Sequence, residues 1–154
     1  MQVSAAEEIQ GPAESVQLVT ACTCCPYFDI PRFFAEADRV LVPAGILAIY
    51  SFTVPKVYHN GVFSTELTNI WLQAYKVFAC GWSPVRKDVE DGYRDPRFRL
   101  PFPGEVRDEG HYQDQTLTLD GVLAYIKTFG CYQKMVRRCG AKRGEALLQQ
   151  TKER

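Results

Sequence analysis

Residues 15–53 decide the fold, beginning with Ser15-Val-Gln-Leu-Val-Thr-Ala-Cys22, a run of apolar and β-branched residues. Such a run is typical of a strand that is buried on both faces in a parallel sheet. A second run of this kind is Gly45-Ile-Leu-Ala-Ile-Tyr-Ser-Phe-Thr53. The segment between the two runs has helical periodicity, and a strand–helix–strand order implies a right-handed parallel crossover. The sequence therefore predicts an α/β fold.

The predicted helix between the strands lies within residues 27–41. Asp29 can accept a hydrogen bond as the N-cap, and Pro31 suits the first helical turn. One face of this helix is apolar and consists of Ile30, Phe33, Phe34, Ala37, Val40 and Leu41. We expect Pro43-Ala44-Gly45 to end the helix.

The second half of the chain is less regular. We expect a helix from Ser64 or Thr65 to Phe78, an irregular or lid-like segment over residues 81–103 with four prolines, and a polar strand within 106–118. Two further helices are predicted over residues 120–132 and 144–152. The expected apolar positions are Leu67, Ile70, Trp71, Ala74, Tyr75, Phe78, Val122, Leu123, Ile126, Phe129 and Cys131. No repeat or domain boundary is visible, so the prediction is one domain over residues 1–154.

Charge and hydropathy exclude several functions. Among the 154 residues, 18 basic side chains balance 18 acidic ones, so no global field favours nucleic acid. A basic cluster, Lys134, Arg137, Arg138, Lys142 and Arg143, is interpreted as a solvated helix face, with anion binding as the alternative. No apolar run reaches the length of a membrane span, and residues 1–10 do not resemble a signal peptide. We therefore expect a cytoplasmic protein with neither nucleic acid nor membrane as a partner.

The six cysteines are expected to be reduced thiols. Cys22-Thr-Cys24-Cys25 could suit a soft metal ion, but a closed zinc site would need another ligand, and buried core cysteines are the preferred interpretation. His111 lies near Asp108, Glu109 and Asp114 in sequence. A His–carboxylate base and a solvated loop are both open interpretations, and the second is preferred. We predict no metal site and assign no catalytic residue.

Three stretches together resemble a known family. They are residues 4–21, with Ser4-Ala-Ala-Glu-Glu-Ile9 before the first strand; residues 27–50, with Tyr27-Phe-Asp-Ile-Pro-Arg-Phe-Phe at their start; and residues 118–133. They are similar to class I S-adenosylmethionine (SAM)-dependent methyltransferases of the methyltransferase type 11 and trans-aconitate methyltransferase-like group. The resemblance implies a partial Rossmann-like fold that begins around the family's third strand and stops before its last, so that the domain is truncated at both ends.

The resemblance also implies cofactor-binding positions. The loop that lies along the adenine corresponds to Ser4, Ala5 and Ala6. The strand end that faces the methionine part of SAM corresponds to Thr20, Ala21 and Cys22. The loop that closes over cofactor and substrate usually reads His-Trp-Phe-Asp in the family and reads Pro26-Tyr27-Phe28-Asp29 here, so Tyr27 and Phe28 complete the predicted cofactor site. The family's Pro-Gly-Gly turn is Pro43-Ala44-Gly45 in this sequence.

One element of such an enzyme is missing from the sequence. No two of the eleven glycines are separated by a single residue, so no G-x-G occurs to bring the backbone close to the cofactor. The resemblance therefore implies a SAM-dependent methyltransferase-like protein acting on a small molecule, incomplete as a standalone enzyme. The alternative is a non-catalytic methyltransferase-like domain that serves as a protein-interaction module. Because the family's flanking strands are absent, we expect a homodimer, a complementing protein partner or a rearranged C-terminal half.

Overall fold

The computed structural model describes residues 3–52, 55–77 and 83–153. Their contacts group them into two compact units. The first unit contains residues 3–52 and 84–107, and the second contains 55–77, 83 and 108–153. Each unit has its own apolar core. The prediction of a single domain over the whole chain stays a prediction.

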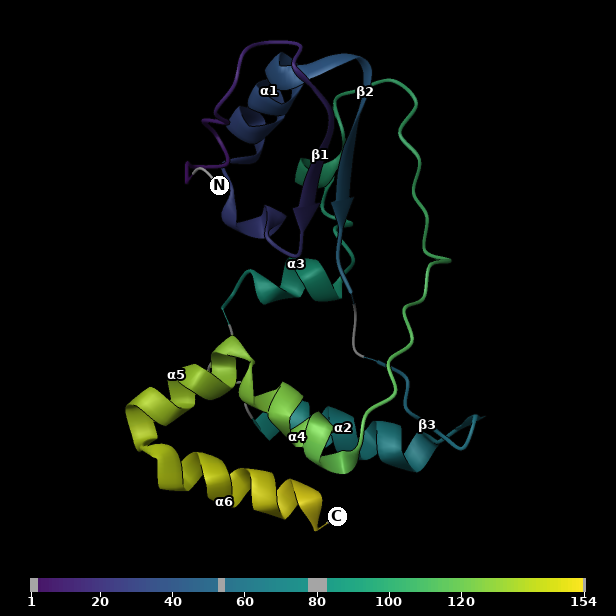
Figure 1. The fold of residues 1–154 in the computed structure, drawn as a ribbon, viewed down its shortest axis with the longest axis vertical. Helices are drawn as coiled ribbons and strands as arrows, with labels where there is room; N and C mark the ends of the chain where they lie inside the picture. Colours follow the sequence, from purple (N-terminus) through teal and green to yellow (C-terminus); the bar gives the residue numbers. More distant parts are fainter. Residues whose placement is uncertain (1–2, 53–54, 78–82, 154) are drawn as a thin grey trace. The chain divides into compact units, whose positions relative to one another are not determined.

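The first unit is built on the predicted strand–helix–strand order. Strand β1 (Val16–Cys22) pairs in parallel with β2 (Leu41–Tyr50), and helix α1 (Ile30–Val40) connects them (Figure 1). The Asp29 side chain accepts a hydrogen bond from the backbone N–H of Arg32, which confirms the predicted N-cap. The α/β fold class is therefore confirmed, as is the partial Rossmann-like arrangement.

The start of β2 corrects one prediction. Helix α1 ends at Val40 without help from Pro43-Ala44-Gly45, and β2 begins directly at Leu41. The pairing then skips from Val16↔Leu41 to Leu18↔Ile46, so residues 42–45 form an irregularity inside the strand. Ala44 has φ +64° there, a conformation that L-residues other than glycine rarely adopt.

The two faces of the β1–β2 sheet have different environments. All six predicted apolar residues of α1 and its C-cap are buried, and this helix packs with Ala21, Cys25, Leu47 and Phe98 in the first core. On the opposite face, Leu18 and its pairing partner Ile46 remain 55% and 61% exposed. Within the described residues the sheet has only these two strands. Leu18 and Ile46 thus form an apolar patch on one face of the sheet, whereas the other face is covered.

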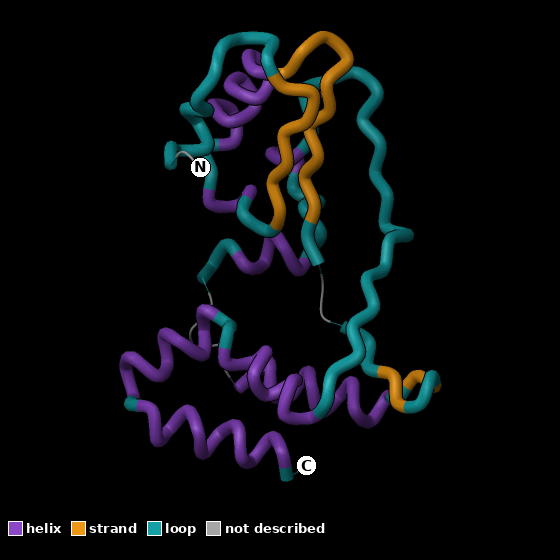
Figure 2. Tube along the Cα trace, viewed as in Figure 1, coloured by secondary structure: helices purple, strands orange, loops and turns teal. Residues whose placement is uncertain are grey.

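Residues 84–107 are integrated into the first core. They contain α3 (Arg86–Glu90) and the 3-10 helix η3 (Pro96–Phe98), and Phe98 is 5% exposed. The segment therefore has more regular structure than the irregular or lid-like segment that we predicted. The polar strand predicted within 106–118 is wrong, because residues 105–118 form no strand and are exposed (Figure 2). The segment pairs with neither described sheet, so it gains none of the cross-strand side-chain contacts that stabilise β-structure.

The second unit consists of a short hairpin and four helices. Strands β3 (Tyr58–His59) and β4 (Val62–Phe63) are joined by Asn60-Gly61, whose positive φ angles suit a two-residue hairpin turn. Helix α2 (Thr65–Val77) confirms the predicted helix up to Val77, whereas Phe78 lies outside the described residues. Helices α4 (Leu119–Lys127), α5 (Gly130–Cys139) and α6 (Ala141–Lys152) follow.

The predicted helix over residues 120–132 is two helices. The chain is extended at Phe129, and the Gln133 side-chain amide donates to the Lys127 carbonyl at 2.7 Å, which satisfies an end of α4. The apolar positions predicted within residues 120–132 are nevertheless right, because Ile126 and Cys131 lie in the second core with Val122, Leu123 and Phe129 packed against it. In α2 the predicted Trp71 is also in this core, whereas the predicted Leu67 is wrong because it is exposed. Helix α6 starts three residues before the predicted Gly144. None of the described helices is both long and apolar enough to span a membrane.

Candidate functional site

The predicted cofactor segments lie in the first unit, at the carboxyl end of β1 and in the loops beside it. The loop with Ser4–Ala6 turns at Ala5, whose carbonyl accepts from the Glu8 N–H at 3.1 Å. The Glu7 carboxylate then accepts from the backbone N–H of Asp29 at 2.7 Å, and Glu8 forms a 3.6 Å ion pair with Arg32. These contacts hold the predicted adenine loop next to the loop that contains Tyr27 and Phe28.

The eight predicted site residues fall into two groups by exposure. The first group can be reached by a ligand and consists of the exposed Ser4, Ala5, Thr20, Cys22 and Tyr27. The second group packs in or against the first core and consists of Ala6, Ala21 and Phe28. Ala21 is only 1% exposed, so its side chain fills the core and only its backbone could face a ligand. The small residues Ser4 and Ala5 permit close approach of a flat ring to the backbone.

The thiols at the end of β1 have different environments. Cys25 is fully buried, and this burial together with the nearby Cys24 raises its pKa to about 12. Burial also raises the pKa of Cys24. Cys22 is exposed, and its Sγ lies 3.5 Å from the Thr23 hydroxyl oxygen. Within the described residues no three His, Cys, Asp or Glu side chains gather as metal ligands would.

Tyr93 was not among the predicted site residues, although the structure brings it to the same thiols. Burial, followed by the charge that Cys25 would carry, raises the pKa of Tyr93 to about 12, and the Ser51 side chain offsets part of this rise. Its hydroxyl is buried and has no partner with hydrogen-bond geometry among the described residues. Tyr93 has φ +56° directly after Gly92 at φ +65°. The Gly92-Tyr93 dipeptide is a turn signal in the sequence, but nothing there indicates contact with β1.

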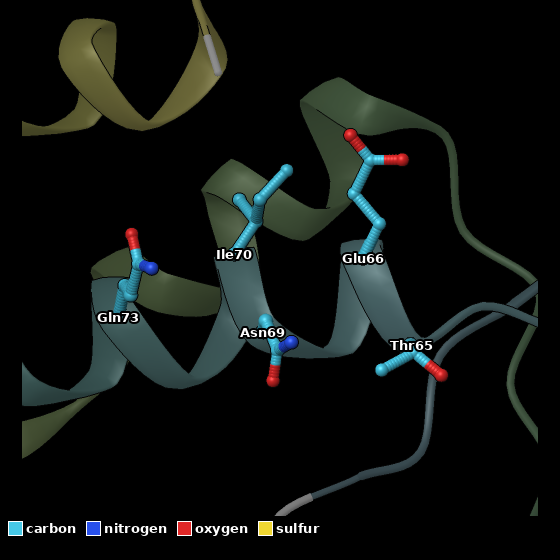
Figure 3. A pocket seen from close by; sticks show the side chains of 5 residues that line it. All are labelled: Thr65, Glu66, Asn69, Ile70 and Gln73. Atoms are coloured by element: carbon cyan, nitrogen blue, oxygen red, sulfur yellow. The ribbon is translucent and has the colours of Figure 1, made fainter.

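Two other candidate groups do not form a site. The His111 Nε2 lies 2.9 Å from the Asp108 carboxylate, but the His111 side chain is 89% exposed in an irregular segment. A general base needs a sheltered, oriented environment, which this pair lacks. In the second unit, a shallow hollow on α2 is lined by Thr65, Glu66, Asn69, Ile70 and Gln73. Figure 3 shows these side chains projecting to different sides of one helix, so no polar groups converge there.

Comparison with known proteins agrees with the fold. No family model matches the chain. A predicted methyltransferase of Dictyostelium discoideum is 31% identical over 136 residues, which are 88% of this chain and 50% of that protein. The tuberculostearic acid methyltransferase UfaA1 of Mycobacterium tuberculosis is 30% identical over 84 residues, 54% of this chain and 19% of that protein.

A solved structure extends the likeness to three dimensions. It is a predicted type II methyltransferase from Anaeromyxobacter dehalogenans, with a TM-score of 0.67 and 26% identity over 97% of this chain and 62% of that one. The chain thus spans about half the length of the first relative and about a fifth of the second. In sequence and in fold, the chain is therefore similar to methyltransferases.

Proposed function

We propose that the chain is a methyltransferase-like protein that contributes part of a SAM site, acts on a small molecule in the cytoplasm, and is incomplete as an enzyme by itself. The observation that carries the proposal is the juxtaposition of the two predicted cofactor loops through the Glu7–Asp29 hydrogen bond. Two segments about 20 residues apart in sequence form one surface at the carboxyl end of β1. In open α/β sheets, ligands bind at this end of the strands.

The described residues fit one side of the cofactor. Ser4 and Ala5 could lie along the adenine, and Thr20, Cys22 and Tyr27 could face the methionine part. SAM supplies an activated methyl group, so the protein's task is to position the acceptor and exclude water. Tyr27 offers an aromatic face that is 66% exposed, suitable for covering a bound ligand. The sequence lacks a G-x-G that would hold the rest of the cofactor.

Ligand titration tests the proposal. Calorimetry with SAM or S-adenosylhomocysteine on the purified chain should show weak binding, and saturation-transfer NMR should detect the adenine protons. Ala5→Trp should abolish the NMR signal, whereas Ala13→Trp, a matched change at another exposed alanine of the first unit, should preserve it. Submicromolar binding by a monodisperse monomer would contradict the proposed incompleteness. Equal effects of the two variants would contradict the proposed site.

The exposed sheet face suggests how the site is completed. Leu18 and Ile46 form an apolar surface on a parallel pair, and parallel strands are normally covered on both faces. We propose that a second copy or a complementing polypeptide covers this face. Either would bury the apolar surface, and neither requires nucleic acid or membrane.

A further inference from the structure

The second unit carries a cationic surface that includes none of the predicted cofactor residues. It consists of Lys134, Arg137 and Arg138 on α5 and Lys142 and Arg143 in the first turn of α6, and is called the basic corner. All five residues are exposed. None forms an ion pair with any other described residue. Residues 121–144 contain no Asp or Glu, and Glu145, the first acidic side chain after the basic corner, forms no ion pair with it among the described residues.

The packing of α5 on α6 holds the basic corner together. Gly144 is buried, and a Cβ at this position would lie 2.8 Å from Val136 Cγ2 and 2.9 Å from Tyr132 Oη. The start of α6 therefore passes very close to α5, and Figure 1 shows the two helices meeting at this turn. Lys134, Arg137 and Arg138 have i, i+3, i+4 spacing and lie on one face of α5. The five cations thus lie on two helices that pack closely where they are joined.

This arrangement opposes local helix stability. Cations three or four residues apart repel each other. Lys142 and Arg143 lie at the positive end of the α6 dipole, and no side chain caps that end. Arg137 and Arg138 gain from the negative end of the α5 dipole, whereas Lys142 and Arg143 lie at the unfavourable end of the α6 dipole, and Glu145 is the one acidic residue of that helix. Residues that destabilise their own local structure occur most often at functional sites. An anionic partner would relieve the repulsion among these cations.

The surroundings indicate the kind of anion. Residues 133–153 contain no aromatic side chain, so no base could stack there as it does in single-strand binding. The apolar face of α5, with Cys131, Tyr132 and Met135, is buried in the second core and cannot insert into a bilayer. Guanidinium groups on a helix face suit pairing with carboxylates. We infer that the basic corner docks an acidic helical segment of a partner protein.

Two synthetic peptides test the docking of the full-length chain. Both have the same alanine and glutamate composition, one with the glutamates at i, i+3, i+4 and i+7 on one helical face and the other with them distributed around the helix. Fluorescence anisotropy at low salt should show roughly tenfold tighter binding of the one-faced peptide, and the difference should fade as salt rises. Equal affinities for the two peptides would overturn the inference, because nonspecific electrostatic attraction would then explain the binding.

Matched variants locate the binding surface. R137E/R138E should weaken binding of the one-faced peptide roughly tenfold or more, and R137Q/R138Q should weaken it less. The control K56E/K87E changes two exposed lysines outside the basic corner and alters the net charge of the chain by the same amount as R137E/R138E. It should leave the affinity for the one-faced peptide unchanged. Equal loss in both charge-reversal variants would refute docking at the basic corner. Tighter, Arg137-dependent binding to a single-stranded oligonucleotide or to phosphatidylserine vesicles would refute the acidic protein as partner.

Discussion

Exchanging the small residues of the β2 irregularity should change the stability of the first unit in opposite directions. A Cβ at Gly45 would lie 2.9 Å from the Val42 carbonyl oxygen and 3.0 Å from Leu41 Cδ2. The carbonyl belongs to the backbone of the turn, and Leu41 is 8% exposed in the core. Neither atom can therefore move away without distorting the backbone or the core packing. Overpacking of this kind lowers the free energy of unfolding by about 1–3 kcal/mol. We therefore expect Gly45→Ala to destabilise the first unit by that amount.

The neighbouring position should respond in the other direction. Ala44 has φ +64°, and left-handed backbone costs an L-residue about 1–2 kcal/mol. Ala44→Gly removes this strain. The greater conformational freedom of glycine in the unfolded chain lowers the free energy of unfolding by about 0.4–1 kcal/mol and so offsets part of the gain. The net expectation is a gain between zero and about 1.5 kcal/mol. Ala48→Gly, in the regularly paired part of β2, is the control and should destabilise.

Hydrogen exchange measured by mass spectrometry suits this test, because residues 3–52 and 84–107 of the first unit contain no tryptophan whose fluorescence could report on it. Peptides that cover β1 and β2 should exchange about 5–150-fold faster in Gly45→Ala, since about 1.4 kcal/mol corresponds to a factor of ten. Unchanged exchange in Gly45→Ala, or faster exchange in Ala44→Gly, would refute the reasoning from the turn geometry.

Three further outcomes are expected. Spectrophotometric titration should show Tyr93 ionising near pH 12. Because the pKa of Tyr93 is raised in the folded state, its contribution to the free energy of unfolding is present below pH 10 and is lost as the pH rises toward 12. Tyr93→Phe should remove this loss of stability at high pH. Iodoacetamide should alkylate the exposed Cys22 and Cys139 before the buried Cys25, and stoichiometric zinc or copper lost on Cys24→Ser would contradict a structural role for the thiols. Sedimentation at low micromolar concentration should reveal self-association or binding of a complementing partner, whereas a stable monomer with strongly protected β1 and β2 would leave only a rearrangement that covers the sheet.

The sequence was most informative where periodicity and capping agreed. For α1, the Asp29 cap, Pro31 in the first turn and six apolar positions all indicate the same helix, and the structure has it. Prediction failed at residues 120–139, because the pattern of apolar residues continues through Phe129 while the backbone breaks there. Apolar periodicity indicates which side chains face a core. Two consecutive helices that pack on the same core can continue one periodic pattern, so the pattern does not show the break between them. The Asn60-Gly61 hairpin had a clear signal that we did not use.

The candidate site was predictable only as separate segments. Family resemblance indicated the Ser4–Ala6 loop and the end of β1, but the hydrogen bond from Asp29 to Glu7 depends on the fold. The family resemblance did not indicate that the Ala21 side chain lies in the core, because burial depends on the fold. Tyr93 reaches β1 from about 70 residues away, and no local pattern reports such a contact.

The discontinuity of the first unit has a consequence for its synthesis on the ribosome. Ala21 and Phe98 belong to the same core, yet the whole first segment of the second unit is translated between them. At a synthesis rate of about 5–20 residues per second, roughly 4–15 s pass between the synthesis of Ala21 and that of Phe98, which completes the packing of β1. During that interval α1 and the sheet can assemble, but the core beside Cys25 stays open to solvent. The nascent chain would therefore be most dependent on molecular chaperones before Phe98 emerges.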